Sequence, residues 1–345
     1  MRGGFRTAAI VAVAVLALAG CGGKSTSGAG DDKKTVKVGL AYDIGGRGDK
    51  SFNDAAYAGL EKVKQDLSVQ TKDLSAKQNE PDSDKEERLR LLAGAGYTPI
   101  IAVGFAYAGP LTKVAKEFPK VRFGIIDGVV DAPNVTSLTF AEEQGSFLVG
   151  AAAALKSKTG TVGFVGGCTT PLIAKFQAGY AAGVKAVNPK VKVLAKDLST
   201  TAQNCSGFND PAAGRTTATG MYEAGADIVF HAAGGSGGGV FQAAKAAKAW
   251  AIGVDSDQYL KADPAVRDVI ITSMLKRVDV AVFNFVKNAA DGKFKSGTEV
   301  FDLKADGVGY ATSGGKIDDI KSKLDDYKQQ IIDGKIIVPT KPSAS

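Results

Sequence analysis

The chain has 345 residues, of which 44% are hydrophobic and 23% charged, a composition typical of a globular protein with room for two domains. Its formal net charge is +7, but acidic residues are interleaved among the lysines without a dense basic patch, which argues against a nucleic-acid partner. Beyond the N-terminal leader, no segment has the length and apolarity of a transmembrane helix.

The first residues have the pattern of an export signal. A basic start, Met1–Arg6, precedes the apolar run Thr7–Leu18, which is too short to span a membrane. Because small residues lead directly to Cys21, the segment is similar to a bacterial lipoprotein signal, in which that cysteine is lipidated and becomes the mature N-terminus. The alternative is an ordinary signal peptide with a chance cysteine. We expect residues 1–20 to be a signal peptide and 21–34 a flexible tether to the extracytoplasmic face of the cell membrane.

After the tether, apolar β-branched runs alternate with helix-length segments. The candidate strands are Val36–Asp43, Pro99–Gly104, Arg122–Asp127, Val135–Phe140, Thr161–Gly166, Val191–Ala195, Asp227–His231, Trp250–Asp255 and Val269–Leu275. The candidate helices are Ser51–Asp66, Asp84–Ala95, Pro110–Phe118, Glu142–Lys156, Pro171–Val187, Asp210–Glu223, Gly239–Lys248 and Ile317–Tyr327. Such alternation predicts parallel sheets covered by helices. Because Ala141–Gly150 separates two sets of these units, we expect an α/β fold of two lobes with a cleft between them.

The loop Gly45–Asp54 joins the first strand to the first helix and carries an aromatic, an amide and acids. Ligands of open α/β sheets bind at the carboxyl ends of strands, where this loop lies. The alternative is a purely structural loop, in which the glycines turn the chain, Ser51 or Asn53 caps the helix and Phe52 packs inward.

Other predicted strands also end in acids, glycines or aromatics. Asp43, Asp127 and Asp255 end strands, and Gly104-Phe105 and Gly234-Gly235 follow others. A cleft with this lining suits a neutral polar ligand with hydroxyls and a flat ring, because carboxylates accept hydrogen bonds and aromatic rings stack.

Enzyme chemistry finds little support in the residues. Gly234–Gly238 fits the G-x-S-x-G pattern of a nucleophile elbow, but the single histidine, His231, lies upstream of the serine, so a Ser-His-Asp triad is not expected. No P-loop or dinucleotide fingerprint occurs, and Cys168, Cys205 and His231 fit no zinc spacing. We therefore expect no cofactor, no metal and no catalytic residue, although a hydrolase acting on the same ligand stays an alternative.

Cys168 and Cys205 are the cysteines left after lipidation of Cys21. On the exported side of a membrane an even pair is a candidate disulfide, with two buried free thiols as the alternative.

Several motifs together resemble one family. They are Gly46–Asp54, Gly124–Asp127, Phe230–Gly237, Ile252–Gln258 and Thr272–Asp279. In this order they resemble the basic membrane protein family, the solute-binding lipoproteins of ABC importers that include purine nucleoside receptors. The resemblance extends from Val36 to Pro339 and implies a type I periplasmic-binding-protein fold, with two Rossmann-like parallel-sheet lobes and a three-stranded hinge. It also implies a nucleoside ligand and ABC permease subunits as partners.

The resemblance implies a role for each matching residue. Phe52 would stack on the nucleoside base, with Ser51 and Asn53 beside it, and Asp127 would contact the base edge. The remaining implied contacts are Asp43 and Asp255 to ribose hydroxyls, Lys276 to a base acceptor, the Gly234-Gly235 backbone at the border, and Phe176 as the second stacking ring, with Phe105 in reserve. The alternatives are a core role for Phe176 and a solvated or salt-bridged hinge role for Lys276.

One stretch departs from the family pattern. Ser199–Phe208, with Cys205, and Cys168 after Gly166-Gly167 place a loop at the edge of the second lobe, where it could alter ligand preference.

We predict that residues 35–141 with 262–293 form the first lobe, and 142–261 with 294–340 the second. The expected function is capture of a nucleoside, with purines foremost, for an importer. The alternatives are a receptor for a sugar or another small solute, and a surface signalling lipoprotein.

Overall fold

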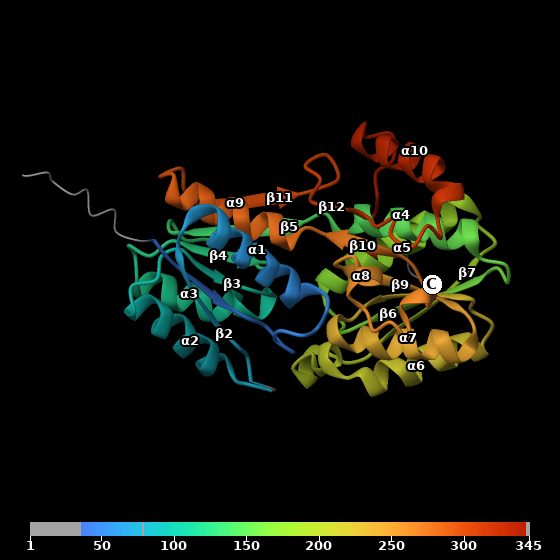
Figure 1. The fold of residues 1–345 in the computed structure, drawn as a ribbon, viewed down its shortest axis with the longest axis horizontal. Coiled ribbons are helices and arrows are strands. Elements are labelled where there is room, and N and C mark those ends of the chain that lie inside the picture. Colours follow the sequence, from blue (N-terminus) through green and yellow to red (C-terminus); the bar gives the residue numbers. More distant parts are fainter. Residues whose placement is uncertain (1–35, 78, 343–345) are drawn as a thin grey trace, which may run out of the picture. The chain divides into compact units, whose positions relative to one another are not determined.

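The structure, a computed structural model, describes residues 36–77 and 79–342. The predicted signal peptide, the tether and Cys21 lie outside the described residues. Two six-stranded sheets organise the described chain, each covered by helices on both faces (Figure 1). The predicted α/β fold of parallel-sheet lobes is therefore confirmed.

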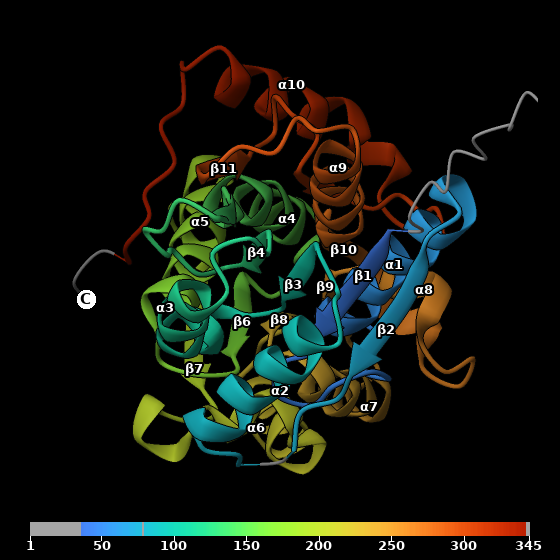
Figure 2. The same cartoon turned by 90° about the vertical axis from the view of Figure 1, so that its left-hand side faces the viewer.

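The first sheet has the strand order β11-β5-β4-β3-β1-β2, and all its neighbouring strands are parallel. Its strands are β1 Lys37–Ala41, β2 Gln70–Leu74, β3 Ile100–Ala102, β4 Phe123–Ile126, β5 Val135–Phe140 and β11 Gly297–Phe301. Helices α1 (Phe52–Leu67) and α9 (Val278–Ala290) pack together on one face, and α2 (Asp82–Gly94) and α3 (Ala108–Glu117) cover the other. Figure 2 looks onto this first lobe, where β1 and β2 lie side by side.

The second sheet has the order β12-β10-β9-β8-β6-β7, with β12 antiparallel to β10. Its strands are β6 Thr161–Gly166, β7 Lys192–Asp197, β8 Ile228–Ala232, β9 Trp250–Asp255, β10 Ile270–Lys276 and β12 Val308–Tyr310. The helices of this second lobe are α4 Glu142–Lys156, α5 Pro171–Val187, α6 Pro211–Glu223, α7 Gly237–Ala247, α8 Gln258–Lys261 and α10 Lys321–Ile332. Short 3-10 turns lie at Phe105–Tyr107, Thr201–Gln203, Ser206–Asn209, Gly234–Ser236, Arg267–Val269 and Asp318–Ile320.

The chain crosses between the two sheets after β5, after β10 and after β11. Backbone hydrogen bonds tie these crossovers together, since the N–H of Ala141 donates to the carbonyl of Phe301 (3.0 Å) and the N–H of Arg277 to that of Gly307 (2.8 Å). The predicted lobe boundaries need correction at this point. β10 pairs with β9 in the second sheet and β11 pairs with β5 in the first, so parts of 262–293 and 294–340 exchange lobes.

Helices α4 and α5 of the second lobe pack backbone to backbone. A Cβ atom at Gly150 would overlap the carbonyl of Tyr180, and one at Gly179 would overlap that of Glu143. Only glycine permits so close an approach. Since α4 begins at the first crossover, the position of α5 beside the cleft is tied to the hinge.

None of the helices within residues 36–77 and 79–342 combines the length and the apolarity that a bilayer crossing requires.

Candidate ligand-binding site

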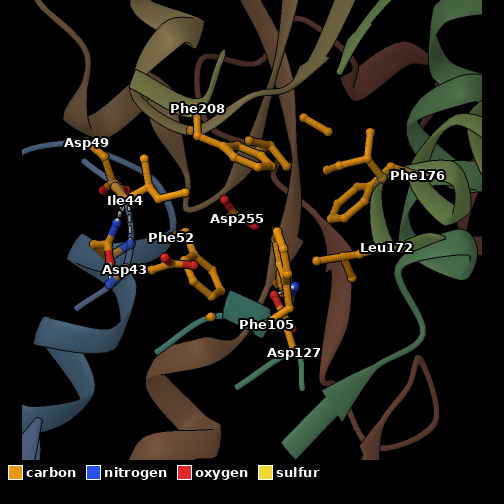
Figure 3. A pocket seen from close by; sticks show the side chains of 17 residues that line it. Asp43, Ile44, Asp49, Phe52, Phe105, Asp127, Leu172, Phe176, Phe208 and Asp255 are labelled. Atoms are coloured by element: carbon orange, nitrogen blue, oxygen red, sulfur yellow. Dashed lines mark hydrogen bonds and ion pairs between the residues drawn. The ribbon is translucent and has the colours of Figure 1, made fainter. Parts of the chain in front are cut away.

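A pocket lies between the lobes, at the carboxyl edges of both sheets. Its lining encloses about 560 Å³ of empty space, including the part open to solvent. Figure 3 shows the phenylalanine rings of the lining, Phe52, Phe105, Phe176 and Phe208, around this space together with aspartate side chains from both lobes. The lining residues are Asp43, Ile44, Asp49, Phe52, Asn53, Gly104, Phe105, Asp127, Leu172, Ile173, Phe176, Phe208, Ala232, Gly234, Val254, Asp255 and Lys276.

The structure brings together all the predicted ligand-binding residues except Ser51 and Gly235, which do not line the pocket. Ser51 is fully buried and its hydroxyl contacts Asp255. Sequence reasoning missed Phe208, Asp49 and several apolar lining residues. Phe208 ends the loop that departs from the family pattern, and Asp49 belongs to the glycine loop, so both stood in stretches already singled out.

Asp49 explains the conformation of the glycine loop. Its carboxylate accepts hydrogen bonds from the backbone N–H groups of Ser51 (2.9 Å), Asn53 (2.8 Å) and Asp54 (3.1 Å), and therefore caps α1. In the alternative interpretation Ser51 or Asn53 caps the helix; Ser51 does occupy the N-cap position, but its side chain makes no cap bond, and the side chain of Asn53 accepts from the N–H of Asp43 at the end of β1 (3.3 Å). With the loop so fixed, Phe52 faces the pocket and is only partly buried.

Three aspartates give the pocket its polarity. Asp43, Asp127 and Asp255 follow or end β1, β4 and β9, and their side chains are almost fully buried. Burial raises the pKa of Asp43 to about 6 and the pKa of Asp255 to about 7, because it disfavours the charged form. Within the described chain, Oδ1 of Asp43 and Oδ1 of Asp127 have no hydrogen-bond partner. The pocket therefore offers buried acceptors to the hydroxyl or N–H groups of a ligand.

Lys276 provides the positive charge of the site. Its Nζ lies 2.6 Å from Oδ2 of Asp127 and 3.1 Å from Oε1 of Glu142, and its side chain is 2% exposed. Burial acts to lower the pKa of Lys276, but Asp127 and Glu142 outweigh it and hold this pKa above its ordinary value. The same ammonium lies 5.2 Å from the ring centroid of Phe52 and 5.5 Å from that of Phe176. Lys276 is thus a buried, salt-bridged hinge residue that also lines the pocket.

The pKa of Asp127 depends on the same two opposing effects, burial and the ion pair with Lys276. Burial raises its pKa to about 6 even though Lys276 acts to lower it. Glu142 also accepts from Lys175 Nζ at 3.0 Å, which extends the chain of charges from the first lobe to α5 of the second. Sequence reasoning missed Glu142, whose role depends on its place beside the first crossover.

Phe208 enters the pocket from the loop between β7 and α6. The disulfide between Cys168 and Cys205 ties this loop to the end of β6. The Ser199 hydroxyl donates to the carbonyl of Gly167 (2.8 Å) and accepts from the N–H of Gly207 (2.9 Å), which fixes the chain just before Phe208. The loop therefore does reach the cleft.

The four rings divide between the lobes. Phe52 and Phe105 come from the first lobe, and Phe176 and Phe208 from the second. The ring centroids of Phe105 and Phe208 are 6.5 Å apart across the cleft. Phe176 is 3% exposed and belongs to the main hydrophobic core, so its core role and its place in the lining coexist. Partly buried Phe208 is better placed than Phe176 to present a ring face.

The groups that suggested chemistry are engaged elsewhere. The hydroxyl of Ser236 donates to the carbonyl of Gly207 (2.6 Å) and accepts from the N–H of Asp210 (2.7 Å). His231 lies 3.0 Å from the Gln258 amide oxygen, and burial lowers its pKa to about 4. Among residues 36–77 and 79–342, no cluster of His, Cys, Asp or Glu could hold a metal ion.

Two parallel-sheet lobes joined by crossovers around an acidic and aromatic pocket define a protein that binds a small solute between its lobes. The family model Bmp, described as ABC transporter substrate-binding protein PnrA-like, matches residues 35–342. The chain belongs to this family. It is therefore a substrate-binding protein of an ABC transporter and not an enzyme, and its partners are a small-molecule ligand and permease subunits.

Relatives and solved structures agree with this assignment. A CD4+ T-cell-stimulating antigen of Listeria innocua serovar 6a is 37% identical, over 94% of this chain and 95% of its own. The ABC transporter nucleoside-binding protein BmpA of Lactococcus lactis subsp. cremoris is 36% identical, over 96% and 97%. A lipoprotein of Pyrococcus abyssi is 35% identical, over 85% and 73%. A solute-binding protein of an ABC transporter system from Aeropyrum pernix K1 has a TM-score of 0.76 at 30% identity, over 90% and 94%.

Proposed function

We propose that this protein captures a nucleoside, in the first place a purine nucleoside, in the interlobe pocket and delivers it to the permease of an ABC importer. The observation that carries the proposal is the combination of buried aspartate oxygens without partners and phenylalanine rings from both lobes around one space. A ribose supplies hydroxyl donors and a base supplies a flat ring. The name of the 36% identical nucleoside-binding relative supports the same ligand class.

The base would lie between Phe52 of the first lobe and Phe208 of the second. Phe208 replaces Phe176 in this role, because the Phe176 ring is buried in the hydrophobic core whereas Phe208 is only partly buried. A purine gives a larger stacking surface than a pyrimidine.

Asp127 and Lys276 together would read the edge of the base. An ammonium has three N–H donors, and one of those of Lys276 goes to Oδ2 of Asp127 (2.6 Å), while Oε1 of Glu142 lies 3.1 Å away as an ion-pair partner. Another N–H of Lys276 would serve a ligand acceptor, and the unpartnered Oδ1 of Asp127 would accept from a ligand N–H. Asp43 and Asp255 would accept from ribose hydroxyls.

We also propose that Cys21 carries a lipid anchor that holds the domain at the extracytoplasmic face of the membrane. The support is the leader sequence and the naming of a relative as a lipoprotein. Replacement of Cys21 by serine should shift the protein from the membrane fraction to the soluble exported fraction. Unchanged membrane retention would contradict the anchor.

Calorimetric titration with a panel of solutes tests the ligand class. Adenosine, guanosine, inosine, cytidine, uridine and two sugars separate the nucleoside proposal from a sugar receptor. We expect purine nucleosides to bind in the micromolar range or tighter, and no binding of any nucleoside up to millimolar concentration would refute the proposal. Chromatography of the same mixtures should show no free base, which distinguishes a receptor from a hydrolase. If no small solute binds, a signalling lipoprotein becomes the better reading.

Two variants test the residues. Phe52→Ala and Asp127→Ala should each abolish nucleoside binding while the circular dichroism spectrum stays native. Phe283→Ala is a matched control, since this ring lies on α9 against Lys62 and outside the pocket. Unchanged affinity in both pocket variants would refute the site.

A further inference from the structure

A second set of contacts joins the lobes directly, beside the pocket. We propose that Lys50 and Ser51 of the first lobe and Val254, Asp255, Ser256 and Gln258 of the second form a latch that stabilises the closed lobes and is coupled to the ligand through Asp255. Only the identity of the ligand rests on the proposed function. The latch itself rests on contacts between protein groups.

Ser51 is the centre of the latch. Its side chain is fully buried, and its Oγ lies 2.5 Å from Oδ2 of Asp255 and 3.3 Å from the carbonyl oxygen of Val254. Because Asp49 caps α1, the Ser51 hydroxyl is not needed within its own lobe. The contact with Asp255 is the shorter of the two, so the Ser51 hydroxyl donates its hydrogen bond across the cleft to Asp255.

Two further hydrogen bonds run in the opposite direction. The hydroxyl of Ser256 donates to the carbonyl of Ser51 (3.0 Å), and the side-chain amide of Gln258 donates to the carbonyl of Lys50 (3.1 Å). Two consecutive carbonyls of the first lobe therefore accept from two side chains of the second, next to the Ser51 donor. Separation of the lobes would break all of these bonds together.

Gln258 is held ready for this contact by its own lobe. Its Oε1 accepts from the N–H of Val254 (2.8 Å) and lies 3.0 Å from Nε2 of His231. The backbone N–H fixes which end of the amide is the oxygen, so the NH₂ end must face Lys50. It follows that Nε2 of His231 carries a proton, and burial, which lowers the pKa of His231 to about 4, keeps the ring neutral near pH 7. The latch donor thus keeps its orientation when the lobes part, which lowers the entropic cost of reclosing.

Asp255 couples the latch to the pocket. Its Oδ2 accepts from Ser51, while the residue also lines the pocket. A ligand that donates to Asp255 and a latch that donates to Asp255 both favour the same carboxylate position, so each supports the other. Ser256 and Gln258 do not line the pocket, so their removal should change opening and closing without removing a ligand contact.

Ser256→Ala is the test variant, with Ser51→Ala as a second variant. Ser137→Ala is the matched control, because Ser137 is equally buried but accepts from Val130 within the first lobe. Each latch bond lost should shift the closed–open equilibrium roughly 2- to 10-fold toward the open form. Hydrogen exchange of the full chain without added nucleoside should then be faster by a similar factor in segments 44–56 and 252–260, and unchanged in the control.

Dissociation of inosine, followed by stopped flow, tests the coupling. We expect Ser256→Ala to speed dissociation by a similar factor. Unchanged hydrogen exchange in both latch variants would overturn the latch, and unchanged inosine dissociation with faster exchange would overturn its coupling to the ligand. If inosine does not bind, the nucleoside that binds most tightly in calorimetry takes its place; if no nucleoside binds, the proposed function fails while hydrogen exchange still decides the latch.

Discussion

Replacement of Lys276 by methionine tests the charge balance at the centre of the site. Methionine keeps much of the side-chain length but removes the ammonium that lies between Asp127 and Glu142. Breaking a buried ion pair by removing one partner typically costs about 3–5 kcal/mol, because the remaining charge is left uncompensated. The Lys276 side chain is 2% exposed and those of its partners are 4% and 1% exposed. We therefore expect Lys276→Met to lower the free energy of unfolding by about 3–5 kcal/mol near neutral pH.

The pKa shifts determine how the stability deficit of Lys276→Met should change with pH. Lys276 has a raised pKa in the folded state, so its stabilisation is fully present at neutral pH and is lost only in strongly alkaline solution. Without it, the pKa of Asp127 rises further, because burial disfavours the charged carboxylate and the opposing ammonium is gone. A carboxyl with a raised folded pKa binds protons more tightly in the native state, so the variant regains stability as the pH falls.

Urea denaturation at about pH 7.5 and about pH 5 measures the effect. We expect the deficit of Lys276→Met relative to the unmutated protein to shrink at the lower pH. Lys287→Met is the control, because Lys287 and its partner Asp291 are both exposed (48% and 37%) and such a surface pair should be worth under about 1 kcal/mol. A deficit of less than about 1 kcal/mol for Lys276→Met near neutral pH, or one independent of pH, would refute the reasoning.

Three further predictions concern the ligand and the loop. Phe208→Ala should weaken nucleoside binding by about 1–3 kcal/mol in calorimetry, which is the usual contribution of one base–aromatic stack. If the variant binds as tightly as the unmutated protein, Phe208 does not contact the ligand. Nucleoside affinity should fall as the pH drops from about 8 to about 6, because burial raises the pKa of Asp255 to about 7 and protonation competes with ligand donors; a flat profile would contradict this contact. Replacing both Cys168 and Cys205 by serine should lower the free energy of unfolding by about 3–4 kcal/mol, because the disulfide closes a loop with a sequence separation of 37 residues. Equal urea midpoints for the variant and the unmutated protein would contradict this.

The sequence was most informative where strands end. Asp43, Asp127, Asp255 and Phe52 were predicted to meet, and they do, because the carboxyl ends of parallel strands converge whatever the details of the intervening helices. Strands such as Thr161–Gly166 and Trp250–Asp255 coincide with their predicted bounds, since nearly continuous apolar runs between turns are a strong signal. The edge strand Gln70–Leu74 was missed because its residues are largely polar.

The misses arise from contacts that local patterns do not encode. Phe208 reaches the pocket through a disulfide and Ser199, and Glu142 reaches Lys276 through the crossover geometry. Periodicity cannot reveal that β10 belongs to the second sheet and β11 to the first, because parallel pairing joins segments far apart in sequence. Ser51 was predicted as a ligand neighbour, whereas its hydroxyl crosses to Asp255, a partner some 200 residues away.

The exchange of β10 and β11 between the lobes has a consequence for the order of folding. The core strands of the second sheet, β6 to β10, come from the continuous stretch 161–276. The first sheet begins near the start of the chain but needs α9 and β11, residues 278–301, to cover one face and complete its edge. During synthesis the first lobe therefore stays incomplete while the whole stretch 161–276 emerges, and the second lobe, which still needs β12 and α10, is completed only after it.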